Sequence, residues 1–234
     1  MSKQYDYIIV GAGSAGCVVA ERLSRDPSKT VLLLEAGGKN NSMLLSIPLA
    51  AAAVLTNKSF SWCYNTEPEK NLNNRSISWP RGKTLGGSSS INGMIYIRGQ
   101  RQDYDSWAAQ GNHGWSFDEL LPYFIRNENN NDRSGPYHGN SGAQWVGDIA
   151  HEFEMSDTFI EAAIDSGIPL NNDFNGPSQE GVGYFQAMIK NGRRQSSATD
   201  YLSLCKKRKN FNLITNALTG KIIVDNGEAI GVQY

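Results

Sequence analysis

The sequence predicts an α/β fold that opens with a Rossmann-type β-α-β unit, and three features predict it. An apolar run at residues 7–10 is followed at once by three glycines with the spacing G-x-G-x-x-G. A helix-length segment comes next, and a second apolar run at residues 31–34 ends at Glu35. An acidic residue about 20 positions after such a turn is typical of a dinucleotide site. The alternative is a plain β-α-β unit with glycine-rich packing.

Each part of this unit has an expected role. Residues 7–10 alternate too little for a strand with one wet face, so we expect a strand buried on both faces. Gly11 permits the tight turn, Gly13 lets a pyrophosphate approach the backbone, and Gly16 lets the helix pack closely on the strand. The helix N-terminus directs free N–H groups at the phosphates, and Glu35 accepts hydrogen bonds from a ribose diol.

Composition and charge argue against a nucleic-acid-binding, secreted or membrane-spanning protein. The net charge of −1 over 234 residues offers no electrostatic footprint for nucleic acid. The three cysteines match no metal or disulfide spacing, which predicts a reducing, cytoplasmic compartment and no metal site. The first strand begins too early to leave room for a signal peptide, and the longest apolar stretch, residues 43–55, is too short to span a bilayer. The basic run at residues 206–209 is expected to be a solvated helix end, with a phosphate or membrane-surface patch as the alternative.

A second glycine-rich segment covers residues 81–99 and reads RGKTLGGSSSINGMIYIRG. Gly86 and Gly87 remove side chains, and the serines at 88–90 supply small donors, so the backbone can press against a flat or phosphorylated ligand. A flexible linker is the alternative, but linkers lack flanking apolar residues such as those at 91–97. The segment therefore predicts an ordered contact with a large cofactor.

The rest of the chain predicts short helices, strands and one hairpin. The expected elements are a helical or ordered apolar stretch at 43–55, helices at 116–126, 156–167 and 196–206, strands at 211–215 and 221–224, a turn at 225–227 and a pairing strand at 229–234. The chain ends in the apolar middle of that last strand, so we expect the N-terminal part of a longer protein.

Residues 82–92, with Tyr96, Gly99 and Asp105 downstream, resemble the first consensus motif of the glucose–methanol–choline (GMC) oxidoreductase family. The stretches WPRGKTLGGSSSINGMIYIRG, DFNGPSQEGVGYFQ and NGRRQSSATDYL are most similar to the choline dehydrogenase and aliphatic alcohol dehydrogenase branch. The resemblance implies a Rossmann-type FAD-binding domain interleaved with part of a substrate domain built on an antiparallel sheet. The implied FAD-binding segments are about 1–40, 78–110 and 196–234, and the implied substrate-domain and lid segments are about 41–77 and 111–195.

The resemblance also implies which residues of this chain bind FAD. Gly11, Gly13, Ser14 and Gly16 would hold the pyrophosphate, Glu35 the adenosine ribose with Ala36 beside it, Thr84, Gly87 and Ser88 the ribityl and phosphate side, Asn92, Gly93 and Met94 the isoalloxazine, and Thr219 the adenine through its backbone. Some relatives attach FAD through a histidine directly before the motif asparagine. Here that residue is Ile91, which has no nucleophilic nitrogen, so non-covalent FAD is expected.

The implied activity is oxidation of a small-molecule alcohol, but the sequence contains no catalytic candidate. His113, His138 and His151 lie in polar, loop-like contexts and are expected at the surface. The resemblance implies a catalytic histidine C-terminal to Tyr234, so this chain alone is expected to be inactive. The choice between choline and aliphatic alcohols, the electron acceptor, and peripheral association with the inner membrane stay open.

Two alternative functions remain open, and a few further residues are considered as site residues. An NAD(P)-dependent enzyme would use the same first turn, and a truncated paralogue would bind nucleotide without catalysis. Asp103 and Asp105 diverge on a helix and form no carboxylate pair. Trp62, Trp79 and Trp107 are expected to be core aromatics, with stacking on a cationic substrate as the alternative.

Overall fold

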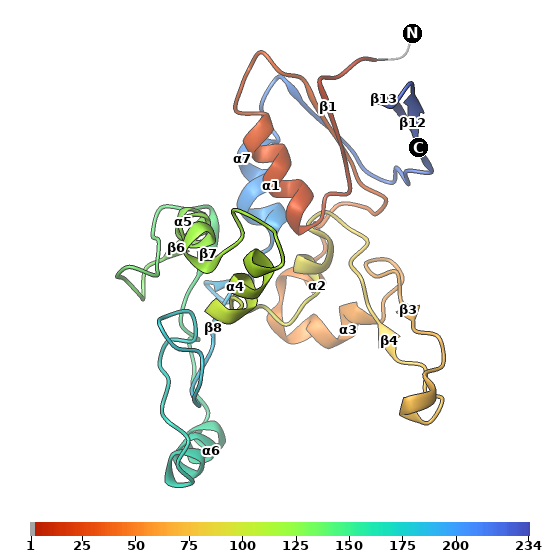
Figure 1. The fold of residues 1–234 in the computed structure, drawn as a ribbon. Helices are drawn as coiled ribbons and strands as arrows, with labels where there is room; N and C mark the ends of the chain where they lie inside the picture. The colour runs from red at the N-terminus through yellow and green to blue at the C-terminus, as the bar shows by residue number, and fades with distance from the viewer. Residues whose placement is uncertain (1–2) are drawn as a thin grey trace. The chain divides into compact units, whose positions relative to one another are not determined.

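The computed structural model describes residues 3–234, which fold into two compact units (Figure 1). The first unit combines the chain up to Gly93 with Arg193–Tyr234, and the second is Met94–Gly192. Helices and strands are mixed in both units, which confirms the predicted α/β class. The predicted division into cofactor and substrate segments concerns function and stays a prediction.

A parallel sheet forms the centre of the first unit. Among the described residues it has three strands in the order β1-β2-β11. They are β1 (Tyr7–Val10), β2 (Val31–Leu34) and β11 (Phe211–Ile214). Helix α1 (Ser14–Leu23) makes the crossover from β1 to β2 and packs on both strands (Figure 1). The predicted β-α-β unit is therefore confirmed.

The expectation that residues 7–10 are buried on both faces is wrong for this chain. In β1, Tyr7 is 39%, Ile8 37% and Val10 48% exposed, whereas every residue of β2 is buried. The difference follows from position in the sheet, because β1 is an edge strand and β2 has a neighbour on each side. An apolar run cannot distinguish an edge strand from a central one.

Several short elements follow β2 along the chain and belong to the first unit. They are α2 (Met43–Ser46), η1 (Pro48–Ala50), α3 (Ala51–Leu55), β3 (Tyr64–Asn65), η2 (Lys70–Leu72), β4 (Ser78–Trp79) and η3 (Gly87–Ser90). The helical or ordered apolar stretch expected at 43–55 is confirmed. Its buried Leu45 and Val54 pack with Ile91 in one apolar cluster, which anchors the second glycine segment.

The first unit resumes after Gly192. Its further elements are β10 (Arg193–Arg194), η4 (Ala198–Leu202), which is a π-helical turn, α7 (Ser203–Cys205), β12 (Lys221–Asp225) and β13 (Glu228–Gln233). Both η4 and α7 pack on α1 (Figure 1). The predicted hairpin is confirmed, because β12 and β13 pair antiparallel around Asn226 and Gly227, which have φ angles of +47° and +85°.

The basic run at 206–209 is only partly a solvated helix end. Its three lysines are exposed, but Arg208 is half-buried and donates from Nη2 to Glu21 Oε1 at 2.9 Å. Glu21 lies on α1 and is 1% exposed, so Arg208 ties the end of α7 to that helix. No helix in the described part of the chain is long and apolar enough to cross a membrane.

The second unit contains eight helices and strands among its described residues, all short. They are β5 (Ile95–Tyr96), α4 (Arg101–Ala109), α5 (Phe117–Asn127), β6 (Glu128–Asn130), β7 (Gln144–Val146), α6 (Glu154–Asp165), β8 (Gln186–Ala187) and β9 (Ile189–Lys190). The helices expected at 116–126 and 156–167 are confirmed within a few residues. Ser116 and Glu119 form a capping box at the start of α5, as the local sequence indicates.

Candidate functional site

A cleft of about 370 Å³ opens in the first unit at the carboxyl ends of β1 and β2. It is lined by the ends of these strands, the first turn of α1, the start of η3 and the chain that follows β11. The predicted site residues that line it are Gly11, Gly13, Ser14, Glu35, Ala36, Gly87, Ser88 and Thr219. Ligands of open α/β sheets bind at this edge, so the cleft has the expected position.

The first glycine turn depends on contacts that side chains would break. Gly11 has φ +90°, and its N–H donates to the Leu34 carbonyl oxygen at 2.8 Å. A Cβ at Gly16 would lie 1.9 Å from the Gly11 carbonyl oxygen, so this glycine lets α1 approach β1. A Cβ at Gly13 would meet no atom within 4 Å, although Gly13 lines the cleft. Gly11 and Gly16 therefore serve the fold, and Gly13 leaves room for a ligand.

The Glu35 carboxylate is buried and already bonded on both oxygens. Oε2 accepts from the Ala12 N–H and Oε1 accepts from the Gly37 N–H, each at 2.8 Å. A carboxylate has about four lone-pair sites, so each oxygen keeps one acceptor position for a ligand. Glu35 thus also fastens the glycine turn to the end of β2, and its role toward a ribose stays a prediction.

The second glycine segment lies directly on the first. The Gly86 N–H donates to the Ala12 carbonyl oxygen at 2.7 Å. Gly87 has φ +53°, and a Cβ on it would lie 2.7 Å from Cα of Gly13. The two glycine segments, which are far apart in the sequence, therefore form one wall of the cleft.

Some predicted site residues do not line the cleft; they are Gly16, Thr84, Asn92, Gly93 and Met94. Thr84 is fully buried, and its hydroxyl donates to the Gly38 carbonyl oxygen at 3.2 Å. Asn92 accepts hydrogen bonds from the Arg194 guanidinium. Met94 is buried in the second unit with φ +63°. The expected contacts of Asn92, Gly93 and Met94 with the isoalloxazine stay predictions. So do the expected contact of Thr84 with the ribityl and phosphate side and that of Gly16 with the pyrophosphate.

Among the lining residues that were not predicted for the cleft are Trp62 and Arg81. Trp62 is half-buried, and the Lys83 ammonium lies 4.6 Å from its ring centroid. The core role expected for the tryptophans is wrong for Trp79 and Trp107, which are 50% and 44% exposed. Arg81 is the first residue of the second glycine segment, and its charge beside the glycines was the sequence signal for it.

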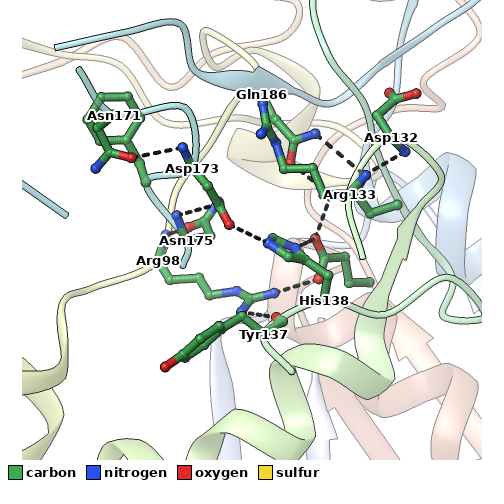
Figure 2. Close-up of polar contacts among 12 residues, drawn as sticks. Arg98, Asp132, Arg133, Tyr137, His138, Asn171, Asp173, Asn175 and Gln186 are labelled. Atoms are coloured by element: carbon green, nitrogen blue, oxygen red, sulfur yellow. Dashed lines mark hydrogen bonds and ion pairs between the residues drawn. The ribbon is translucent and has the colours of Figure 1, made fainter. Parts of the chain in front are cut away.

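The second unit holds a buried charged cluster around His138 (Figure 2). The surface position expected for the histidines is confirmed for His113 and His151 and is wrong for His138, which is 8% exposed. Its Nδ1 lies 3.0 Å from Glu128 Oε1, and its Nε2 lies 2.9 Å from Asp173 Oδ2 (Figure 2). The local sequence around His138 did not indicate this burial, because Glu128 and Asp173 lie 10 and 35 positions away along the chain.

Glu128 is the centre of this cluster. It has no exposed surface, and its Oε2 accepts from Arg98 Nη2 at 2.6 Å and from the Gly139 N–H at 3.1 Å. Asn130 Nδ2 donates to Oε1 at 2.9 Å. Glu128 begins β6, Arg98 follows β5, and His138 lies between β6 and β7, so the cluster joins the separate elements of the second unit.

The protonation state of the cluster follows from its geometry. Both ring nitrogens of His138 face carboxylate oxygens, so both can donate only when the ring is charged. The hydrogen bond to Glu128 raises the His138 pKa, burial opposes it, and Asp173 adds to the rise. Burial alone would raise the pKa of Glu128, but hydrogen bonds from His138 and Asn130 and the Arg98 charge lower it. Two cations therefore face two carboxylates.

The cleft of the first unit suits the adenosine diphosphate part of a dinucleotide. Its volume falls in the usual range of about 300–1,000 Å³ for ligand sites. The first turn of α1 contains no acidic residue, so its N–H groups favour an anion. The Thr219 hydroxyl is buried without a partner among the described residues. Fold and cleft together are those of a Rossmann-type dinucleotide-binding protein.

The chain belongs to the GMC oxidoreductase family, whose model matches residues 5–234. It is 46% identical over 232 residues to an alcohol dehydrogenase [acceptor] of Pseudomonas putida, covering 98% of this chain and 42% of that protein. It is 43% identical over 236 residues to an oxygen-dependent choline dehydrogenase of Vibrio vulnificus, covering 100% of this chain and 42% of that protein. The chain therefore spans less than half the length of these oxidoreductases.

Solved structures share the fold. Pyridoxine 4-oxidase from Mesorbium loti superposes with a TM-score of 0.93 at 32% identity, covering 98% of this chain and 45% of that one. An FAD-dependent oxidoreductase from Chaetomium thermophilum gives a TM-score of 0.89 at 31% identity, covering 98% and 41%. The family resemblance of the glycine segments and the Rossmann-type fold are thereby confirmed.

Proposed function

We propose that this chain binds FAD non-covalently and forms the cofactor-holding part of an oxidoreductase that acts on the CH–OH group of an alcohol. The contact between the two glycine segments carries this proposal, because it places Gly87 and Ser88 at the same cleft as Gly11 and Gly13. A simple dinucleotide turn needs only the first segment. The Chaetomium thermophilum relative, described as FAD-dependent, supports the choice of cofactor.

In this proposal each wall of the cleft has one task. The first turn of α1, with Gly13 and Ser14, holds the pyrophosphate through backbone N–H groups. The free acceptor positions of Glu35 take hydrogen bonds from the adenosine ribose. Gly87 and Ser88 border the phosphate and ribityl side of the cofactor. These positions are supported by the shared cleft, whereas the isoalloxazine contacts of Asn92, Gly93 and Met94 rest on the family motif alone.

The names of the relatives support an alcohol substrate, either choline or an aliphatic alcohol. When bound, FAD supplies the acceptor for the hydride of the substrate. Oxidation also needs a base for the hydroxyl proton, and a histidine suits that task near neutral pH. The family resemblance implies a catalytic histidine C-terminal to Tyr234. We therefore place the base in the part of the relatives that this chain does not span.

Uptake and release of flavin test the proposal. The purified chain is expected to retain about one FAD per chain after desalting, and acid or guanidinium should release all the colour. Release is expected because Ile91, at the position of the covalent link in some relatives, is an alkyl side chain that is 2% exposed and packed against Leu45 and Val54. Colour that stays with the denatured chain contradicts non-covalent binding. Tight binding of NAD(P) instead of FAD contradicts the choice of cofactor.

The chain alone is expected to be inactive even when it holds FAD. The reason is that the family resemblance implies a catalytic histidine C-terminal to Tyr234, so we expect this chain to lack the group that takes the hydroxyl proton. The measurement is an assay of the FAD-loaded chain with choline or a primary alcohol and an artificial electron acceptor. Steady turnover well above that of free FAD contradicts the placement of the base outside this chain.

A further inference from the structure

Arg194 is the second residue of β10 and is 4% exposed, yet it was not among the predicted site residues. Its guanidinium reaches four acceptor oxygens on three residues. Nε donates to the Leu45 carbonyl oxygen at 3.1 Å, and Nη1 donates to the Asn92 carbonyl oxygen at 2.7 Å and to Asn92 Oδ1 at 2.9 Å. Nη1 also approaches the Ser89 carbonyl oxygen at 3.4 Å.

These acceptors belong to the carboxyl end of η3 and to α2. The last carbonyl groups of a helical turn have no partner within the turn, so they need an outside donor. The same turn begins with Gly87 and Ser88, which line the cleft. Arg194 therefore bonds to the carboxyl end of the η3 segment, and the first two residues of that segment line the cleft.

The positive charge of Arg194 has no carboxylate partner among the described residues. No carboxylate among the described residues forms an ion pair with Arg194, and its pKa is lowered by burial alone. Guanidinium groups nevertheless stay charged in proteins. A buried cation held only by carbonyl oxygens and an amide oxygen adds an uncompensated positive charge next to the 87–92 segment. That charge favours an anionic ligand in the cleft.

The neighbouring Arg193 has none of these features. It is exposed, and no hydrogen bond or ion pair of its side chain exists among the described residues. The two adjacent arginines thus have the same charge and neighbouring positions on one strand but different environments. They form a matched pair of target and control.

We infer that Arg194 is a positioning residue for cofactor binding. It holds the 87–92 segment in the conformation that forms the cleft wall, and its uncompensated charge adds to the affinity for the diphosphate of the cofactor. This inference rests on the proposed FAD function and assigns a specific residue to it. Arg194 acts through Ser89 and Asn92 and makes no contact with the reacting atoms.

The test compares Arg194→Gln, Arg194→Lys and Arg193→Gln with the parent chain by FAD titration, at a temperature where each variant keeps the native far-UV circular dichroism. Losing the charged donor should weaken FAD binding by on the order of 10- to 100-fold in Arg194→Gln. Arg194→Lys should recover part of this loss, since it keeps the charge but not the planar fork. Arg193→Gln should bind within about twofold of the parent, as expected for an exposed residue without partners.

The visible circular dichroism of bound FAD provides a second measurement, because it reports on the environment of the bound flavin. A change in the stability of the protein alone does not alter it. Its band should change in Arg194→Lys and stay unchanged in Arg193→Gln. Parent-like FAD affinity in Arg194→Gln overturns the role of Arg194. If that variant does not fold, parent-like affinity and spectrum in Arg194→Lys overturn it instead. A parent chain that takes up no FAD overturns the proposed function, which is a different result.

Discussion

Replacing Gly13 by valine is expected to abolish FAD binding while leaving the unliganded chain folded. Gly13 has extended backbone angles at the start of α1, which valine adopts, and a Cβ there meets no atom within 4 Å. The new side chain would instead occupy the cleft at the helix N-terminus, where the pyrophosphate is proposed to lie. Stability should fall by no more than about 1 kcal/mol, the usual scale of a poorer N-cap residue.

The matched control is Gly16→Ala, three residues further along the same turn. Its Cβ would lie 1.9 Å from the Gly11 carbonyl oxygen, so α1 must move away from β1. Overpacking of this kind costs about 1–3 kcal/mol, and the loss should appear without any ligand. FAD titration and thermal unfolding of both variants separate the two effects. Normal flavin content in Gly13→Val contradicts the placement of the cofactor.

Replacing Glu128 by glutamine is expected to have the largest effect on stability. The substitution leaves Arg98 and His138 buried side by side without the carboxylate that both contact. Removing one partner of a buried ion pair typically costs about 3–5 kcal/mol. Denaturant unfolding of the chain at neutral pH measures this loss. A change below about 1 kcal/mol means that solvent reaches the cluster, which contradicts its burial.

The cluster also predicts how stability depends on pH. The His138 pKa is raised in the folded state, so its contribution is complete below the ordinary value of 6.5 and is lost as pH rises through the raised pKa. The Glu128 pKa is lowered, so its contribution is present above 4.5 and is lost as pH falls through the lowered value. Stability from the cluster should therefore be greatest between these two transitions.

Two histidine variants check the alkaline transition. His138→Gln should remove the loss of stability above the ordinary histidine pKa, because no imidazolium is then available to lose its proton. His113→Gln should leave the pH profile unchanged, since His113 is exposed. The measurement is the free energy of unfolding from pH 5 to 9. An alkaline loss that persists in His138→Gln assigns it to another group.

Local sequence signals predicted those parts of the fold that depend only on residues a few positions apart in the sequence. The glycine turn, the capping box at Ser116 and the hairpin at Asn226 each need particular residue types within a few positions. Their backbone conformations follow from the absence of a Cβ, from a side chain that bonds a nearby N–H, or from a left-handed turn. Such constraints are visible in the sequence before any tertiary contact is known.

The cleft was predictable only in part. The two glycine motifs pointed to Gly13 and Gly87 separately, but the sequence did not show that these glycines touch. It also did not show that Ala12 and Gly37 occupy one acceptor position on each oxygen of Glu35. The contact between Gly13 and Gly87 and the hydrogen bond from Ala12 to Glu35 join segments that are far apart in the chain. A local motif does not show which distant segment it will touch.

The sequence by itself determined that this protein has a Rossmann-type unit, two glycine-rich segments and the motifs of the GMC family. The tertiary structure alone decided that β1 is exposed, that the Arg194 guanidinium bonds to Asn92 and that His138 lies buried between two carboxyl groups. The physical reason is the range of the interactions. Turn and helix signals act over a few residues, whereas burial and charge pairing depend on which distant segments come into contact.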